Sequence, residues 1–67
     1  MITDKQLFAF TQFVGDTIGK EMKKADIQML AIRYFGVNPK EARELTIRCT
    51  ELEYIALTAS NYKILTV

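Results

Sequence analysis

Apolar side chains recur every three or four positions along most of this chain, the spacing that places them on one face of an α-helix. This rhythm predicts one helix over about residues 3–18 and a second over about 24–35. Their inward positions are Leu7, Phe10, Val14 and Ile18 in the first helix, and Ile27, Leu30, Ala31, Tyr34 and Phe35 in the second. We expect these side chains to share one core.

A third and longest helix is predicted over residues 38–60, where two apolar rows run along the same segment. The first row is Ala42, Leu45, Cys49, Leu52, Ala56 and Ala59, and the second is Ile47, Thr50, Tyr54, Leu57 and Asn61. At about 100° per residue the two rows lie roughly 160–180° apart. A helix that is apolar on opposite sides needs cover on both, so we predict that one row faces the core and the other a second molecule.

Capping signals fix two of the three helix starts. Thr3 with Gln6, and Asn38 with Glu41, have the spacing of a capping box, in which each residue of the pair bonds the other's backbone N–H. Pro39 falls at the first helical position, where its missing N–H costs nothing. We therefore expect helices to begin beside Thr3 and Asn38.

The C-terminal stretch, residues 62–67, is rich in β-branched and aromatic side chains and loses the helical rhythm. It is predicted to be extended, either as a strand that pairs with its copy in another subunit or as an arm across the core. The predicted fold is thus all-α: one compact three-helix domain over residues 1–67 with a short extended C-terminal tail.

The composition limits the kinds of chemical site that this chain can form. The sequence has no histidine and a single cysteine, which excludes an internal disulfide and removes the usual ligands of a structural metal site. Cys49 lies on the inner row, where a thiol behaves as a small hydrophobe. No phosphate loop or dinucleotide motif is present. We therefore predict no enzyme activity, no metal, no cofactor and no small-molecule substrate.

The sequence also bears on partners and location. Nine basic residues against eight acidic ones give a net charge of +1, without the basic excess typical of nucleic-acid-binding domains. No apolar run approaches the roughly 18 residues of a membrane-spanning helix, and no lysine-rich amphipathic face suits a membrane surface. With one cysteine and no convincing signal peptide, a cytoplasmic location is predicted.

One segment carries a resemblance to a known family. Between residues 28 and 47, a helix, a glycine turn and a second helix follow one another; the positions concerned are Gln28, Ala31, Phe35, Gly36, Val37, Ala42 and Leu45. This pattern resembles the helix-turn-helix superfamily. The resemblance implies that the second helix enters the DNA major groove and that its exposed early residues contact bases, here Asn38, Lys40, Arg43, Glu44 and Ile47. Ile32 stands where the family has a small residue.

Two functions follow from these patterns. The first is a small non-enzymatic regulatory module that associates with a partner protein or with its own copy, through Ile47, Tyr54, Leu57, Tyr62 and Ile64. A phage or mobile-element regulator would fit this description. The alternative is a helix-turn-helix DNA-binding regulator that uses Asn38, Lys40, Arg43 and Ile47, which the small net charge disfavours.

Overall fold

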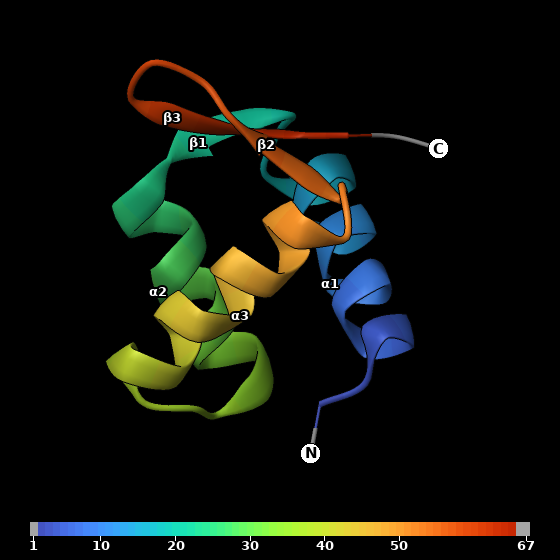
Figure 1. The fold of residues 1–67 in the computed structure, drawn as a ribbon, viewed down its shortest axis with the longest axis vertical. Coiled ribbons are helices and arrows are strands. Elements are labelled where there is room, and N and C mark those ends of the chain that lie inside the picture. The colour runs from blue at the N-terminus through green and yellow to red at the C-terminus, as the bar shows by residue number, and fades with distance from the viewer. Residues whose placement is uncertain (1, 66–67) are drawn as a thin grey trace.

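The computed structural model describes residues 2–65 and contains helices and a small antiparallel sheet (Figure 1). In chain order the elements are α1 (Asp4–Thr17), β1 (Glu21–Lys23), α2 (Lys24–Phe35), α3 (Pro39–Glu51), β2 (Ile55–Leu57) and β3 (Asn61–Ile64). The sheet lies across one end of the three helices (Figure 1). The predicted all-α fold is therefore wrong, because three segments pair as strands.

The predicted helix starts are confirmed by both capping boxes. The Thr3 hydroxyl accepts a hydrogen bond from the Gln6 backbone N–H, and the Gln6 side chain accepts one from the Thr3 N–H. Asn38 and Glu41 repeat this exchange at the start of α3, with Pro39 as its first residue. These reciprocal bonds satisfy amides that have no partner within the helix, which is why both helices begin at the predicted positions.

The third helix ends at Glu51, well before the predicted end at Ser60. Its last turn closes with bonds from the Glu53 N–H to the Thr50 carbonyl and from the Tyr54 N–H to the Cys49 carbonyl, the pattern of a Schellman motif. This motif needs a left-handed residue after the helix, and Glu53 adopts that conformation with φ of 62°. The chain therefore leaves the helix there and turns into β2.

The sheet has the order β1-β3-β2, so the last strand in the chain is the central one. Met22 of β1 and Leu57 of β2 both pair with Tyr62 of β3 in antiparallel register. The C-terminal segment is thus a strand, as one of its two predicted forms had it, but it pairs within its own chain. Thr66 and Val67, the end of the predicted tail, lie outside the described residues.

The core lies between the inner face of the sheet and the helices. Its sheet residues are Met22, Ile55, Tyr62 and Ile64, and its helical residues are Leu7, Phe10, Val14, Ile27, Ala31, Ala42 and Cys49. A β-carbon added at Gly15 would lie 3.1 Å from the Ile64 Cγ2 atom, so this glycine lets α1 approach β3 closely. The sheet therefore covers helical core residues for which the predicted all-α arrangement had no covering layer.

Candidate functional site

The α2–α3 corner follows from its turn residues. Gly36 ends α2 in the left-handed conformation with φ of 68°, and Val37 and Asn38 complete the turn before α3 begins. The small side chains of Ala31 and Ala42 are fully buried, one in each helix of the corner. The helix-turn-helix segment that the sequence predicted between residues 28 and 47 is therefore two helices joined by a short turn.

The outward face of α3 carries most of the side chains predicted to contact DNA. Lys40, Arg43 and Glu44 are exposed. Ile47, one turn further along α3, has 49% of its surface exposed. Asn38 is exposed as well, but its Oδ1 atom accepts the Glu41 N–H at 2.8 Å and so serves the helix cap. Two cations, one carboxylate and one apolar side chain thus share this face.

The five residues predicted to form a protein interface do not share one surface. Tyr62 and Ile64 point into the core, with 8% and 2% of their surface exposed. Tyr54 lies beyond α3 and is half-buried, with its ring 5.3 Å from that of Phe8 in an edge-to-face contact. Ile47 on α3 and Leu57 on β2 remain about half exposed. Of the five predicted interface residues, Ile47 and Leu57 are therefore the two most accessible to a partner.

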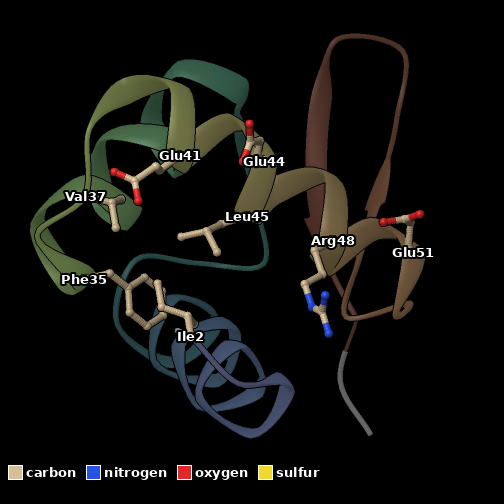
Figure 2. Close-up of a pocket in the computed structure, with 8 residues that line it drawn as sticks. All are labelled: Ile2, Phe35, Val37, Glu41, Glu44, Leu45, Arg48 and Glu51. Atoms are coloured by element: carbon tan, nitrogen blue, oxygen red, sulfur yellow. The ribbon is translucent and has the colours of Figure 1, made fainter.

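A groove of about 590 Å³ lies between α3, the α2–α3 turn and Ile2, two residues before α1 (Figure 2). Its apolar lining comes from Ile2, Phe35, Val37 and Leu45, and Leu45 points from α3 toward Phe35 and Ile2 in Figure 2. The charged lining residues are Glu41, Glu44, Arg48 and Glu51, which follow one flank of α3. The groove therefore combines an apolar floor with a charged rim.

The cation of this rim is engaged by the first helix. Arg48 donates hydrogen bonds from its Nε, at 2.8 Å, and from its Nη2 to the Asp4 Oδ1 atom, which joins α3 to the start of α1. The Asp4 hydrogen bond, with the charge of the same carboxylate, raises the pKa of Arg48 further above its ordinary value. Arg48 therefore stays charged and tied to Asp4, and its charge does not offset the rim glutamates.

Cys49 lies on the opposite side of α3 from solvent, with 1% of its surface exposed. Burial disfavours the thiolate and raises the pKa of the thiol to about 11, although the nearby Arg48 lowers it slightly. A nucleophilic or metal-binding role would need the opposite shift. Across residues 2–65 there is no group of three or more side chains suited to hold a metal ion.

A second apolar surface lies on α1 and α2, where the sequence pattern had predicted core residues. Phe13 and Tyr34 are 44% and 46% exposed, and their ring centroids lie 5.5 Å apart. Ile18 and Met29 line a shallow hollow nearby, with 53% and 54% of their surface exposed. Helical spacing predicted that Ile18 and Tyr34 face inward, but Ile18 is the C-cap residue of α1 and both side chains are about half exposed.

Comparison of the chain with protein-family models, with curated proteins and with solved structures found no match. Within residues 2–65, none of the helices combines the length and the apolar character needed to span a bilayer.

Proposed function

We propose that this chain is a non-enzymatic DNA-binding module in which α3 enters the major groove and the β2–β3 hairpin lies beside the DNA backbone. The observation that carries the proposal is the α2–turn–α3 corner with an exposed second helix, followed directly by an antiparallel hairpin. This order of elements resembles that of winged helix-turn-helix domains, where such a helix contacts bases.

The side chains on the exposed face of α3 suit the edges of base pairs. Lys40 and Arg43 offer donors for the O6 and N7 atoms of guanine. Ile47 would contact a thymine methyl group. These residues lie in the first two-thirds of α3, the part of a recognition helix that reaches deepest into the groove.

Backbone contacts would come from the hairpin and from the start of α2. Lys63 is exposed on β3, and Lys23 and Lys24 are exposed where β1 passes into α2. No side-chain hydrogen bond caps the start of α2, so its first amides are free to meet a phosphate. Together with Lys40 and Arg43, these cations would give the module its affinity for DNA, despite a net charge of only +1.

The first test is fluorescence anisotropy with a labelled mixed-sequence DNA duplex across a series of salt concentrations. On this non-specific duplex all five cations would neutralise phosphates, which gives an expected slope of roughly −4.5 for the logarithm of the binding constant against that of the salt concentration. We expect a dissociation constant of about 1–100 µM at physiological salt, the usual range of non-specific binding, and tighter binding at lower salt. Absence of binding at about 50 mM salt would contradict the proposal, because electrostatic attraction is strongest there.

A matched pair of variants localises the contact. Lys40→Glu combined with Arg43→Glu should weaken DNA binding by about 100-fold or more, because it removes two contacts and adds repulsion. Lys5→Glu combined with Arg33→Glu changes the net charge equally at exposed positions outside α3 and should cost much less. Equal losses from both pairs would mean that α3 is not the contact surface.

Protein association is the second candidate, and the exposed apolar side chains favour it. Phe13 with Tyr34 on one side, and Ile47 and Leu57 elsewhere, expose large apolar area for so small a chain. We propose self-association through such a surface, which is compatible with DNA binding because helix-turn-helix proteins often bind as dimers. A cytoplasmic location would suit both roles.

Light scattering separates the possible self-contacts. If the chain forms a dimer, Phe13→Asp should reduce its measured mass when the α1–α2 surface is the contact, and Leu57→Asp when the hairpin edge is. Both side chains are about half exposed, so neither change should unfold the monomer. A monomer for the unaltered chain at high concentration would contradict self-association.

A further inference from the structure

The floor of the groove beside α3 consists of apolar side chains that remain partly exposed to water. Ile2, Phe35, Val37 and Leu45 line it from three separate parts of the chain, and all four are only partly buried. Burying the remaining apolar area would contribute roughly 25 cal/mol per Å². Figure 2 shows Leu45 facing Phe35 and Ile2, so a side chain that enters the groove would meet apolar atoms at its floor.

The rim of the groove has a strong excess of negative charge. Glu41, Glu44 and Glu51 are exposed along it, whereas Asp4 at one end pairs with Arg48. Among the groove-lining residues that the structure describes, Arg48 is the one cation, and Asp4 already engages it. An occupant of this groove therefore needs apolar side chains for the floor and positive charges for the rim.

We propose that this groove docks a cationic amphipathic helix of a partner protein. From Glu41 to Glu51 the rim follows ten residues of α3, which is about 15 Å or nearly three helical turns. A partner helix with apolar residues at i, i+3 or i+4, and i+7 would fill the floor, and flanking lysines or arginines would face the glutamates. The same carboxylates repel phosphates, so nucleic acid does not occupy this flank.

The groove adjoins the face of α3 proposed for DNA, and Glu44 lies at the boundary between the two surfaces. Arg43 and Arg48 are five residues apart, which places them about 140° from each other around the helix axis. The partner helix can therefore dock while Lys40 and Arg43 face the DNA. Such a contact would attach a second protein to the module without competition for bases.

The test uses a designed peptide as the probe, a labelled helix of about 18 residues, five turns, with leucines on one face and lysines on the other. Its control is the same peptide with every lysine replaced by glutamate. Anisotropy titrations should give saturable binding of the lysine peptide, at least 10-fold tighter than that of the glutamate peptide. Amide NMR shifts should concentrate at Ile2, Val37 and Leu45. Equal affinity for both peptides, or no saturation, would overturn the proposal.

Matched charge reversals give the second arm. Glu44→Lys should weaken the lysine peptide by about 10-fold, equivalent to about 1.4 kcal/mol, whereas Asp16→Lys, an equal charge change at an exposed position on α1, should change it by less than about 2-fold. Glu41 is left unaltered because it caps α3. Equal losses from both variants would overturn the docking site, as would sedimentation showing that Glu44→Lys abolishes a dimer of the chain itself.

Discussion

The two sides of α3 are attached to the rest of the molecule by different physical means. On the inner side, Ala42, Thr46 and Cys49 are buried to 2% exposure or less, and the Thr46 hydroxyl is satisfied by the Arg43 carbonyl. On the groove side, the link to α1 is the Arg48–Asp4 ion pair, in which the side chains are 54% and 47% exposed. One attachment excludes water and the other is surrounded by it.

This difference separates stability from function along a single helix. Burial of apolar area is the main source of folding free energy in a small domain, whereas exposed ion pairs contribute about 0–1 kcal/mol. The inner side can therefore hold α3 in place while its exposed flanks accept changes of charge. We therefore expect changes of charge on either proposed binding surface to leave the chain folded.

The largest expected effect is on the buried side. Ile27→Ala removes part of a fully buried side chain from the core that also contains Ala42 and Cys49, and should lower the free energy of unfolding by about 2–5 kcal/mol. Met29→Ala in the same helix alters a side chain that is 54% exposed and should change it by less than about 0.5 kcal/mol. Urea denaturation measures both. Similar losses of unfolding free energy from the two variants would contradict the burial of Ile27 in the core.

The next effect concerns the thiol on the buried side. With a pKa of about 11 against an ordinary 9.0, Cys49 holds about 100-fold less thiolate at pH 8 than a free thiol. Alkylation by iodoacetamide should therefore be at least that much slower in the folded chain, and should recover in denaturant. A folded chain that reacts as fast as the denatured one would contradict the burial.

The same shift gives a pH dependence with a definite sign. The folded pKa is raised, so the neutral thiol is favoured by folding, and this contribution is complete below the ordinary pKa of 9.0. It is lost as the pH rises from about 9 to about 11. Comparing urea denaturation of the unaltered chain with Cys49→Ala isolates it, because the difference between them should shrink above pH 9.

A smaller effect is expected where α3 begins, between its two sides. Asn38→Ala removes the side-chain acceptor of the Glu41 N–H and should cost about 1 kcal/mol of unfolding free energy. Asn38→Gly should cost only a few tenths of a kcal/mol, since glycine is tolerated at this position. A thermal denaturation series measures both losses, and no loss from either variant would mean that the side-chain bond contributes nothing.

The smallest effect is expected on the groove side. Asp4→Asn removes the charge that pairs with Arg48 and should cost at most about 1 kcal/mol, with the loss decreasing as salt is added. A double-mutant cycle with Arg48→Met measures the coupling between the two side chains. A coupling above about 2 kcal/mol would show that this attachment is not the weak one.

Local chemistry made the helix starts and the α2–α3 turn predictable. Each side chain of the two capping boxes bonds a backbone amide three residues away; the residues are Thr3, Gln6, Asn38 and Glu41. Such local bonds can be predicted from the sequence alone. Gly36 is similar, because glycine takes the left-handed conformation without steric cost. These signals need no knowledge of the rest of the fold.

The sheet depends on contacts that the local pattern does not contain. The apolar row of α3 continues past Glu51 at helical spacing, and the residue that ends the helix is Glu53 rather than a glycine. The strands β1 and β2 have three residues each, too short for a distinct alternation. They form because β3 pairs with both. Two of the proposed interface residues, Tyr62 and Ile64, became core residues for the same reason.

The order β1-β3-β2 also has a consequence for synthesis of the chain. Within residues 2–65, β1 and β2 pair only with β3, the last of the three to leave the ribosome. A nascent chain halted before residue 61 would hold three helices without the strand that joins the other two. Its apolar residues would stay open to chaperones or to neighbouring chains until translation delivers Tyr62 and Ile64.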